Sequence, residues 1–424
     1  MNEGKRTQLS VVIPAIDEGE TIGGLIGRVK QVVERITESH EIIVVDGGSR
    51  DRTVQAALAV GARVVQQRGK GYGGALRTGF REARGEYVFT MDADLSHEPE
   101  FFLRMWELRE QLDVVIASRY IPGASAEMSP FRFLLSSLLN AVYGAFLSLG
   151  IRDLSSGFRM YRKIALDSIV FEGEDFDTLQ EILLKLHCQG WRVGEVPFHY
   201  HVRRSGKSHA RVLKFALAYL KTLFKMWHFR NSIQCADYET RAFYSRIFLQ
   251  RYWQRKRHKI VLDFARAEGR FCDVGCGSSK IIMDLPAAVG VDLSFRKLRY
   301  LRRTNKRLVQ ASLFKLPFPD GSFDCVICSE VIEHIPLEGA LEALKRILSP
   351  GGILVLGTPD YDKRTWRIIE KIYGWIHPGG YAHEHITHYT YASLKEALEK
   401  IGFEILQNTY ICNSELIFQA RRTR

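Results

Sequence analysis

Residues 87–95 read YVFTMDADL, an apolar run that ends in two acidic residues. The run has the composition of a β-strand, and residues i and i+2 of a strand point to the same side. Asp92 and Asp94 can therefore point together beyond the carboxyl end of that strand, where open α/β sheets bind ligands. Two carboxylates side by side suit a hard divalent cation, which proteins usually share with substrate phosphates. The stretch predicts an α/β sheet and chemistry on a diphosphate.

Apolar strands alternate with helical stretches on both sides of this segment, and a second series of the same kind follows. The predicted strands are residues 9–13, 41–45, 62–65, 87–91 and 114–117, then 271–274, 288–291, 309–311, 325–328 and 353–356. The predicted helices are residues 21–38, 51–60, 74–83, 337–348 and 394–401. This repetition predicts parallel sheets with helices on both faces. Because 424 residues are too many for one ordinary core, we expect an α/β protein of two doubly wound domains, residues 1–232 and 233–424.

The composition is that of a globular protein, with 46% hydrophobic and 25% charged residues. Residues 1–8 are polar and charged, so we expect no secretory signal. Seven cysteines without the paired spacing of small secreted folds indicate a reducing compartment, in which thiols stay reduced. We therefore expect a cytoplasmic protein, and the sequence indicates no particular protein partner.

Nearly all of the net charge of +12 comes from one stretch, residues 203–259. It holds fifteen Lys or Arg against two acids, Asp237 and Glu239, so that the rest of the chain is nearly neutral. Such a concentration suits a membrane surface with anionic lipid, at about 1 kcal/mol for each Lys or Arg near it. Nucleic acid is a competing interpretation, and a solvated linker is a third. We expect a membrane surface and no nucleic acid as partner.

The uncharged segment 133–151 is nearly long enough to cross a bilayer. Ser136, Asn140, Gly144 and Ser148 recur within it every four residues, which gives a helix one small, polar face. That pattern fits a helix lying against the domain or in the lipid interface better than one surrounded by lipid. We therefore expect a peripheral protein on the cytosolic face of the membrane, without a transmembrane span.

Acidic and glycine-rich loops follow the strands of the first half, at the edge where ligands bind. Residues 14–18 read PAIDE, and residues 46–51 read DGGSRD, in which glycines let backbone approach a ligand. Residues 68–75 read RGKGYGGA and offer cations, Lys70 among them, and flexible amides ahead of a helix, which suits a phosphate. Each acidic loop alone could be a helix cap. All of them in this order instead indicate one binding site.

Together these residues resemble the family 2 glycosyltransferases, the dolichol- and polyprenyl-phosphate mannosyltransferases in particular. The motifs that carry the resemblance are VVDGGSRDRT at 44–53, MDADLSH at 91–97, SRY at 118–120 and DLSSGFR at 153–159. The resemblance covers about residues 8–210 and implies a GT-A fold. It also implies inverting transfer of a hexose, with mannose from GDP-mannose as the expected donor, to a dolichyl or polyprenyl phosphate.

The same resemblance implies roles for single residues. The nucleotide sugar would be held by Pro14, Glu18, Asp46 and Asp92, by Lys70 of the glycine-rich loop, and by Arg203 in a basic loop with Gly206 and Ser208. Asp92, Asp94 and Ser96 would lie around a metal, Mg²⁺ or Mn²⁺. Arg119, Arg132 and Ser136 match positions that hold the acceptor phosphate, and Asp94, Arg119 and Arg132 would be catalytic. The chain departs from the family at Gly47, where a second Asp is frequent, and at His209, where the family has Lys.

An ionised acceptor needs placing more than it needs a strong base. A phosphate monoester has a second pKa of about 6 and is mostly dianionic near pH 7, and the planar fork of arginine suits it. If residues 133–151 crossed the bilayer, the 153–159 motif would lie on the far side from Asp92 and Asp94, yet the family builds one site from both. A polysaccharide or other glycan acceptor stays open as the alternative, with the arginines binding something else.

A second glycine-rich turn follows a strand in the second half. Residues 271–279 read FCDVGCGSS, and Asp292 ends the next strand, where an acid suits ribose hydroxyls. This turn alone would leave dinucleotide binding open. Together with LPFPDGSFD at 316–324, EVIEHI at 330–335 and LSPGG at 348–352, it resembles class I S-adenosylmethionine-dependent methyltransferases, over about residues 245–424.

This second resemblance implies a Rossmann-like fold with S-adenosylmethionine as cofactor. Asp273, Gly275 and Gly277 would contact its methionine part, and Asp292 its ribose. The chain departs from the pattern at Ser279, where a third glycine is usual, and at Ser312, where an acid near the adenine is frequent. A binding module with a degenerate methyl-donor pocket therefore stays open, as does methylation of nucleic acid. No catalytic base is identified.

Some residues of metal-binding or base-stacking type have simpler interpretations. Cys325 and Cys328 have metal-like spacing, but residues i and i+3 of a strand face opposite sides. His383, His385 and His388 near Glu384 could bind a metal, whereas related methyltransferases use a similar stretch as structure or substrate lid. Trp227 and Trp253 suit a core or an interface as well as a stacking role.

Overall fold

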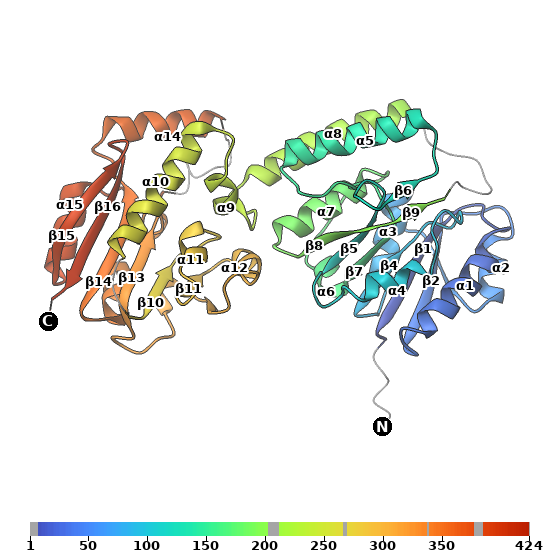
Figure 1. Cartoon of the computed structure of the whole chain (residues 1–424), viewed down its shortest axis with the longest axis horizontal. Coiled ribbons are helices and arrows are strands. Elements are labelled where there is room, and N and C mark those ends of the chain that lie inside the picture. The colour runs from blue at the N-terminus through green and yellow to red at the C-terminus, as the bar shows by residue number, and fades with distance from the viewer. Residues whose placement is uncertain (1–6, 202–211, 266–268, 337–338, 377–384, 424) are drawn as a thin grey trace, which may run out of the picture. The chain divides into compact units, whose positions relative to one another are not determined.

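The computed structural model of the chain describes residues 7–201, 212–265, 269–336, 339–376 and 385–423, without the side chains of residues 132, 212–218 and 373–376. The chain divides into two compact units, each with a sheet of its own (Figure 1). The first unit contains Met1–His187 and Trp191–Arg230, and the second contains Cys188–Gly190 and Asn231–Arg424.

The described residues of the first unit form a seven-stranded sheet in the order β3-β2-β1-β4-β7-β5-β8. Its strands are β1 (Leu9–Ala15), β2 (His40–Asp46), β3 (Arg63–Gln66), β4 (Tyr87–Thr90), β5 (Val114–Ser118), β7 (Arg159–Arg162) and β8 (Val193–Pro197). A separate small sheet pairs β6 (Ser125–Ala126) with β9 (His199–Tyr200). The five strands predicted for this half are confirmed; the apolar residues of β1, β2, β4 and β5 are buried on both faces, whereas β3 at the edge of the sheet is only partly buried.

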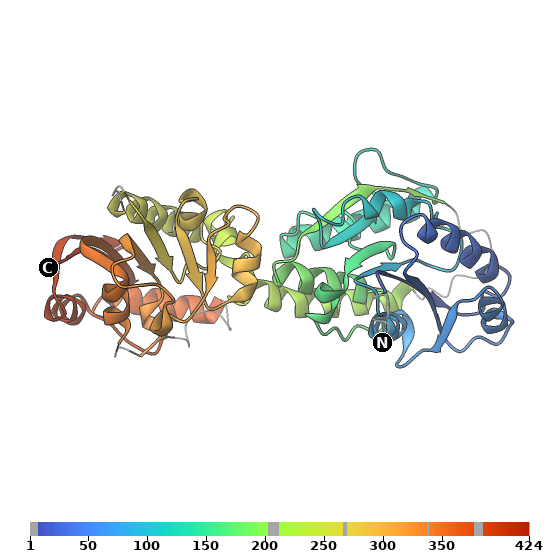
Figure 2. The same cartoon turned by 90° about the horizontal axis from the view of Figure 1, so that it is seen from below.

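Helices cover both faces of this sheet (Figure 2). They are α1 (Ile22–Glu34), α2 (Thr53–Ala59), α3 (Gly71–Glu82), α4 (Phe101–Trp106), α5 (Pro130–Leu147), α6 (Lys163–Asp167), α7 (Thr178–Cys188) and α8 (Val212–Asn231). On one face, Leu25 of α1 and Phe102 of α4 share a core with Val11 of β1. On the other face, α3 packs so closely that a Cβ at Gly79 would lie 2.2 Å from Val12. Neighbouring residues of β1 thus face opposite cores, as in a doubly wound fold.

The described residues of the second unit form another seven-stranded sheet, in the order β12-β11-β10-β13-β14-β16-β15. Its strands are β10 (Phe271–Val274), β11 (Val289–Asp292), β12 (Leu308–Gln310), β13 (Phe323–Ser329), β14 (Leu348–Pro359), β15 (Phe403–Ile411) and β16 (Glu415–Arg422). The strand order reverses between β10 and β13. The carboxyl ends of these two strands therefore flank the point where sheets of this kind bind ligands.

Helices lie on both faces of the second sheet as well. They are α9 (Tyr238–Phe243), α10 (Phe248–Phe264), α11 (Lys280–Asp284), α12 (Phe295–Leu301), α13 (Ala340–Ile347), α14 (Arg364–Ile376) and α15 (Tyr391–Lys400), with the 3₁₀ turns η1 (Leu313–Lys315) and η2 (Ile332–His334). Leu344 of α13 shares one core with Cys328, whereas Ile260 of α10 shares another with Cys325. The two cysteines of β13 thus lie on opposite sides of the sheet as predicted, and both are buried free thiols.

Both sheets are mixed, so the prediction of parallel sheets is wrong in this respect. Strand β7 runs antiparallel to β4 and β5, and β16 runs antiparallel to β14 and β15. The pattern of apolar residues in a strand reflects its burial and does not record the direction of its neighbours. An antiparallel strand in an otherwise parallel sheet is common in large α/β folds.

Helix α5 turns its small, polar face toward the protein and its apolar face outward. Asn140 is buried, and its Oδ1 accepts a hydrogen bond from the N–H of Leu154 at 3.1 Å. The exposed large apolar side chains of the helix are Phe131, Phe133, Leu134, Leu135, Leu138, Val142 and Phe146. The helix thus lies against the domain, one of the two arrangements that the sequence left open, and the structure decides which face turns inward. Within the described part of the chain, no helix combines the length and the apolar character that a membrane crossing requires.

Helix α8 extends the apolar surface of α5. The ring centroids of Phe146 and Phe224 lie 6.3 Å apart, so the two helices pack against each other. Leu220 and Phe224 are exposed. The outward sides of α5 and α8 together form a surface that we call the apolar face.

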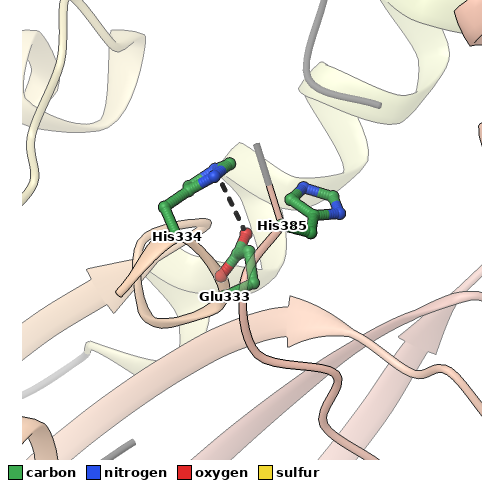
Figure 3. A group of neighbouring side chains, drawn as sticks. All are labelled: Glu333, His334 and His385. Atoms are coloured by element: carbon green, nitrogen blue, oxygen red, sulfur yellow. Dashed lines mark ion pairs between the residues drawn. The ribbon is translucent and has the colours of Figure 1, made fainter. Parts of the chain in front are cut away.

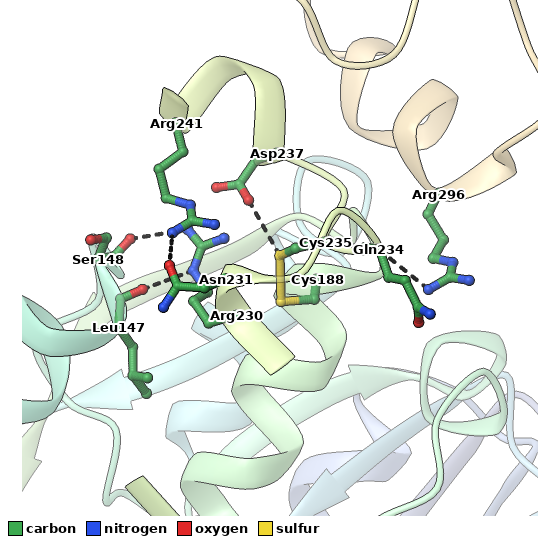
Figure 4. Close-up of a disulfide and its surroundings, with 10 residues drawn as sticks. All are labelled: Leu147, Ser148, Cys188, Arg230, Asn231, Gln234, Cys235, Asp237, Arg241 and Arg296. Carbon is green, nitrogen blue, oxygen red and sulfur yellow. Dashed lines mark hydrogen bonds between the residues drawn. A yellow bond between two sulfur atoms is a disulfide. The ribbon is translucent and has the colours of Figure 1, made fainter. Parts of the chain in front are cut away.

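A disulfide joins Cys188, the last residue of α7, to Cys235 in the segment before α9 (Figure 4). The N–H of Ala236 donates to the Cys188 carbonyl oxygen at 2.9 Å, and Arg241 donates to Asn231 Oδ1 at 2.6 Å. The expectation that the cysteines stay reduced is wrong for this pair. Cysteine spacing could not reveal it, because residues separated by 47 positions meet only in the fold.

Candidate active sites

The loop after β2 is closed by its own carboxylate at the carboxyl edge of the first sheet. Asp46 is buried, and its two oxygens accept hydrogen bonds from the N–H groups of Gly48 and Ser49, each at 3.1 Å. Gly48 has a φ of 94°, a conformation that favours glycine. Pro14 lies beside this loop, in the β1 position that pairs with Val45. The predicted residues Pro14 and Asp46 are thus neighbours.

A second network joins the loop after β1 to the start of α2. The buried Glu18 accepts a hydrogen bond from Thr21 Oγ1 at 2.9 Å, and its N–H donates to Thr53 Oγ1 at 2.8 Å. Asp51 accepts from the N–H of Gly19 at 2.8 Å. Although burial acts in the other direction, hydrogen bonds from Thr53 and Gly19 lower the pKa of Asp51. Asp51 is absent from the predicted site, and it ties the two acidic loops together as an anion.

Asp92 and Asp94 lie directly beyond β4. Asp92 Oδ1 accepts a hydrogen bond from Tyr72 Oη at 3.2 Å, and its N–H donates to His97 Nδ1 at 3.1 Å. Asp94 Oδ1 accepts from both the N–H and the hydroxyl of Ser96, at 3.1 and 2.5 Å. Ser96 is fully buried. It therefore contributes to the site by holding the Asp94 carboxylate in place.

His97 belongs to the 91–97 motif but is not among the predicted site residues, and its ring lies against Asp92. Its ring stacks on Phe158 with centroids 4.7 Å apart. Burial lowers the pKa of His97 to about 4, against the opposing effect of Asp94. A neutral ring can accept the N–H of Asp92 at Nδ1. His97 thus fixes the backbone of the acidic loop without adding charge.

Gly157 lets the 153–159 motif approach Asp92. A Cβ at this position would lie 2.5 Å from Tyr72 Oη and 3.4 Å from Asp92 Oδ1. Thr90 at the end of β4 donates to the Gly157 carbonyl oxygen at 2.7 Å. The structure therefore brings this motif beside the carboxylates that end β4.

Arg119 is held rigidly at the end of β5 by Asp153, a residue that was not predicted as part of the site. The guanidinium donates to the Asp153 carboxylate from Nε at 2.8 Å and from Nη2 at 2.9 Å, and to Ser155 Oγ at 2.8 Å. Asp153 is fully buried, and it also accepts the N–H groups of Arg119 and Ser156. Although burial favours the neutral acid, Arg119 lowers the pKa of Asp153. The guanidinium stays charged, because Asp153 outweighs the effect of burial and raises the pKa of Arg119.

The other predicted acceptor residues lie partly outside the description. Ser136 accepts a hydrogen bond from Tyr120 Oη at 2.8 Å, and the Arg119 guanidinium lies 5.3 Å from the Tyr120 ring. Ser136 and Arg119 are thus linked through this tyrosine. Arg132 belongs to the first turn of α5, but its side chain is outside the described part, and so are Arg203, Gly206, Ser208 and His209.

The glycines after Lys70 serve packing. A Cβ at Gly71 would lie 2.3 Å from the Glu174 carbonyl oxygen, and one at Gly73 would lie 2.0 Å from that of Gly173. The Gly73 N–H donates to Glu174 at 2.8 Å, so this amide cannot also bind a phosphate. Gly71 and Gly73 are needed for close contact with residues 173–174, and the predicted phosphate cradle stays a prediction for the other amides of this loop. Lys70 itself is exposed at the start of α3.

The predicted methyl-donor residues of the second unit line one cavity of about 950 Å³. Gly275 and Gly277 have φ values of 76° and 54°, and a Cβ at Gly275 would lie 2.2 Å from Val331. Asp292 accepts hydrogen bonds from the N–H of Gly277 at 2.8 Å and of Ser294 at 2.7 Å. It thereby closes the glycine turn, and a carboxylate keeps further lone pairs for hydroxyl groups.

Asp273 provides the test of whether the cavity suits S-adenosylmethionine. It is buried at the end of β10, and its Oδ2 has no hydrogen-bond partner among the described residues. Burial and then Asp292 raise the pKa of Asp273 to about 7. A cationic partner such as the ammonium group of the methionine part would favour the ionised form of this buried carboxyl and would give Oδ2 the hydrogen bond that it lacks. The residues present therefore fit this cofactor.

Glu239 and Lys297 complete the glycine turn and were missed from the sequence. Glu239 of α9 accepts the N–H and the hydroxyl of Ser278, at 3.2 and 2.5 Å, and pairs with Lys297 of α12. Despite burial, Glu239 raises the pKa of Lys297. The only sequence signal was an acid inside an otherwise basic stretch. Trp253 is buried and donates to Glu415, so it belongs to the core.

Comparison with known proteins finds a matching family model for each half of the chain. Residues 10–170 match the family model Glycosyl transferase family 2, and residues 245–408 match the model Methyltransferase domain. The chain is 31% identical over 235 residues to a dolichol-phosphate mannosyltransferase of Pyrococcus furiosus, over 53% of this chain and 65% of that protein. It is 34% identical over 213 residues to a polyprenol monophosphomannose synthase of Mycolicibacterium smegmatis, over 47% of this chain and 79% of that protein.

A solved structure of glucosyl-3-phosphoglycerate synthase from Mycobacterium tuberculosis, in complex with Mn²⁺ and uridine diphosphate, aligns with a TM-score of 0.41. The identity is 21%, over 52% of this chain and 79% of that chain. The chain spans less than two thirds of the length of the Pyrococcus relative. Both predicted resemblances are confirmed, as is the α/β fold class with a glycosyltransferase fold followed by a methyltransferase fold. The chain therefore belongs to the family 2 glycosyltransferases and carries a methyltransferase domain after the glycosyltransferase domain.

Proposed function

We propose that the first domain transfers a hexose, mannose from GDP-mannose, to a dolichyl or polyprenyl phosphate, with inversion at the sugar carbon. The observation that carries the proposal is the site itself. Asp92 and Asp94 lie beyond β4, the 153–159 motif reaches Asp92 through Gly157, and Asp153 of that motif anchors Arg119. The names of the two relatives support a polyprenyl-type phosphate as acceptor.

Asp92 and Asp94 would hold Mg²⁺ or Mn²⁺ with the diphosphate, and Ser96 would keep Asp94 oriented. A bound divalent cation offsets the negative charge that develops on the leaving nucleoside diphosphate. The hydrogen bond that Asp92 accepts from Tyr72 and the one that its N–H donates to His97 fix the loop before substrate arrives. Such preorganisation reduces the cost of binding a charged substrate. Asp46, Glu18 and Pro14 would bind the nucleotide part, with Lys70 and Arg203 at the phosphates.

Arg119 would place the acceptor phosphate. Its bonds to Asp153 and Ser155 use Nε and Nη2, so Nη1 can donate to an anion. Tyr120 would carry the same interaction to Ser136 on α5, next to Arg132. An acceptor that is already ionised needs this placing more than it needs a general base.

The apolar face would rest on the cytosolic side of the membrane and receive the lipid tail. Its side chains are large and exposed although Asn140 on the opposite side of α5 is buried, which is the reverse of an ordinary surface helix. An interfacial helix buries such a face at the boundary between headgroups and acyl chains. The acceptor phosphate would then stay near Arg119 while its chain remains in lipid.

Labelled nucleotide sugars, polyprenyl phosphate vesicles and Mn²⁺ test this proposal with the purified chain. We expect lipid-extractable label from GDP-mannose, lost on adding a chelator and on Asp94→Asn, and retained in Glu100→Gln at the exposed Arg28–Glu100 pair. Label that reached a soluble glycan instead would overturn the lipid acceptor in favour of a polysaccharide or other glycan.

We propose that the second domain transfers a methyl group from S-adenosylmethionine within the same pathway. The unpartnered Asp273 carboxylate at the cavity supports this, since a degenerate pocket would have no use for it. Calorimetry with S-adenosylmethionine is the test. We expect micromolar binding that Asp273→Asn weakens by at least about tenfold, or 1.4 kcal/mol. Absence of binding would instead support the degenerate module.

A further inference from the structure

Three side chains gather in the second domain at the wall of the methyl-donor cavity: Glu333, His334 and His385 (Figure 3). One ligand atom of each lies within 4.8 Å of the other two. Glu333 and His334 belong to η2, whereas His385 lies in the segment before α15.

Backbone hydrogen bonds hold the two segments of this cluster together. The N–H groups of Ile386 and Thr387 donate to the Glu333 carbonyl oxygen at 2.7 and 3.0 Å. Thr387 Oγ1 donates to the Ile335 carbonyl oxygen at 2.7 Å. The three side chains are therefore brought together by the fold, and their approach does not depend on the attraction between them.

Glu333 has a carboxylate oxygen that lacks a hydrogen bond. The side chain is fully buried, and Oε2 accepts from Thr358 Oγ1 at 3.2 Å. Oε1 has no hydrogen-bond partner among the described residues, and it lies 3.9 Å from His334 Nε2 within the cluster. Leaving such an oxygen buried and unsatisfied is unfavourable, since it has lost its hydrogen bonds to water. An absent positive ligand would account for it.

His385 is oriented in the manner of a metal ligand. Its Nδ1 lies 2.6 Å from Tyr361 Oη and 3.2 Å from Glu370 Oε1, and its ring stacks on Trp366. Ligating histidines commonly make such a bond from the second ring nitrogen to a carboxylate, which fixes the tautomer. Nε2 is then the nitrogen that can bind a cation.

We propose that Glu333, His334 and His385 bind one divalent transition-metal ion, and that its open positions take an oxygen atom of the methyl acceptor. Two imidazoles and one carboxylate suit Zn²⁺, Fe²⁺, Co²⁺ or Mn²⁺ better than Ca²⁺ or Mg²⁺, which prefer oxygen ligands. Three protein ligands leave at least one position open. His388 stacks on Tyr361 at 4.0 Å and stands outside the cluster, and His383 and Glu384 lie outside the described residues.

The place of the site points to the class of acceptor, and this part rests on the proposed methyl transfer. His334, His385 and Glu370 line the same cavity as Asp273 and the glycine turn. A cation there would lower the pKa of a bound hydroxyl group. The hydroxyl proton would pass to solvent and the oxygen would form the new O–C bond. The C–S bond of the sulfonium donor would break, with its electron pair left on sulfur. The acceptor is accordingly a hydroxyl compound.

Metal binding to the full chain tests the site without any catalytic readout. The chain is stripped with a chelator, dialysed against Zn²⁺ or Co²⁺, and analysed for bound metal and for the visible absorption of Co²⁺ with nitrogen ligands. Every variant is made in a chain that also contains Asp94→Asn, which removes the proposed cation site of the first domain. We expect one bound ion per chain, and affinity lower by at least about 100-fold in Glu333→Gln, His334→Asn and His385→Asn.

Two further variants sharpen the result. Glu370→Gln should weaken binding by about 10–100-fold, as loss of a carboxylate behind a ligating histidine does. His388→Asn on the same segment is the matched control and should bind normally. Circular dichroism and S-adenosylmethionine binding check that each variant folds. If Glu333→Gln does not fold, the His334→Asn variant provides the test, because His334 is only half-buried.

Zn²⁺ binding that these changes leave intact, or no binding below millimolar concentration, would overturn the site. Zn²⁺ bound without S-adenosylmethionine binding would overturn the methyl-transfer proposal and leave the metal site standing. When Co²⁺ and S-adenosylmethionine are both bound, a change in the visible absorption of Co²⁺ on adding hydroxyl compounds, but not on adding their methyl ethers, would support the acceptor class. Equal response to both would overturn that class.

Discussion

Replacing Asp153 with Asn tests whether the buried Arg119–Asp153 pair holds the acceptor side of the first site. Asp153 is fully buried and accepts hydrogen bonds from Arg119 through Nε, Nη2 and the backbone N–H, and from Ser155 and Ser156. The amide keeps the shape but removes the charge, so Arg119 is left buried without its counterion. Breaking a pair of this kind costs about 3–5 kcal/mol.

The expected loss of stability is large enough to measure as a shift in Tm. A domain of about 150–250 residues loses about 2–4 °C in Tm for each kcal/mol, so Asp153→Asn should lower its Tm by about 6–20 °C. Differential scanning calorimetry of the full chain measures this shift, and the second domain provides an internal reference. Glu100→Gln removes an exposed ion pair of similar length and should cost about 1 kcal/mol at most. A Tm loss in Asp153→Asn no larger than that in Glu100→Gln would refute the reasoning.

The same pair predicts a pH dependence. The pKa of Asp153 is lowered in the folded protein, so its stabilisation is fully present above the unfolded pKa of about 3.9 and is lost as pH falls through the folded pKa. The difference in unfolding free energy between the wild type and Asp153→Asn should therefore be constant from about pH 5 to 7, because this range lies above the unfolded pKa. It should shrink below about pH 4, as measured by urea unfolding. A difference that stayed constant to about pH 2 would contradict the assignment of the effect to this carboxylate.

Three further substitutions test other parts of the chain. Gly157→Ala should destabilise the first domain by about 1–3 kcal/mol and weaken Mn²⁺ binding, because its Cβ would press on Tyr72, which donates to Asp92. Scanning calorimetry measures the loss of stability, and titration calorimetry measures the Mn²⁺ affinity. Gly275→Ala should weaken S-adenosylmethionine binding by at least about tenfold, since its Cβ would overlap the side chain of Val331. Gly351→Ala is the control: its φ is also positive, but a Cβ there meets no neighbouring atom, so the variant should lose stability without losing affinity for S-adenosylmethionine. Leu134→Glu on the apolar face should weaken binding to anionic vesicles by about 10–100-fold, while Leu58→Glu on α2 should not; equal effects in a flotation assay would argue against the proposed membrane surface.

The strand-end positions of the acids could be predicted because they depend on local pattern. The run before Asp92 is short, apolar and rich in aromatic and β-branched residues, a composition that favours a buried strand. The acids Asp46, Asp92, Asp273 and Asp292 lie in or directly after strands of the structure as the motifs indicated. Strand alternation in β13 likewise separated Cys325 from Cys328 and argued correctly against a joint metal site.

Partners that come from distant segments could not be predicted in this way. Nothing near Asp153 indicates that it binds Arg119, thirty-four positions earlier. Glu239 lies in a basic stretch that was interpreted as a linker or membrane surface, yet it completes the glycine turn. From the sequence, His383, His385 and His388 suit structure or a substrate lid as well as a metal, all within one segment, whereas the structure places His385 with Glu333 and His334 from another segment.

By itself the sequence determined the fold class, the two families and the loops in which the acids lie, because periodicity and short motifs act over a few residues. Only the tertiary structure decided that both sheets are mixed, that the polar side of α5 faces the protein, and that Cys188 pairs with Cys235. It also decided which of the acids are held by an arginine, a hydroxyl or another loop. These features depend on strand direction and on contacts between residues far apart in the chain, and no local pattern of side chains records them.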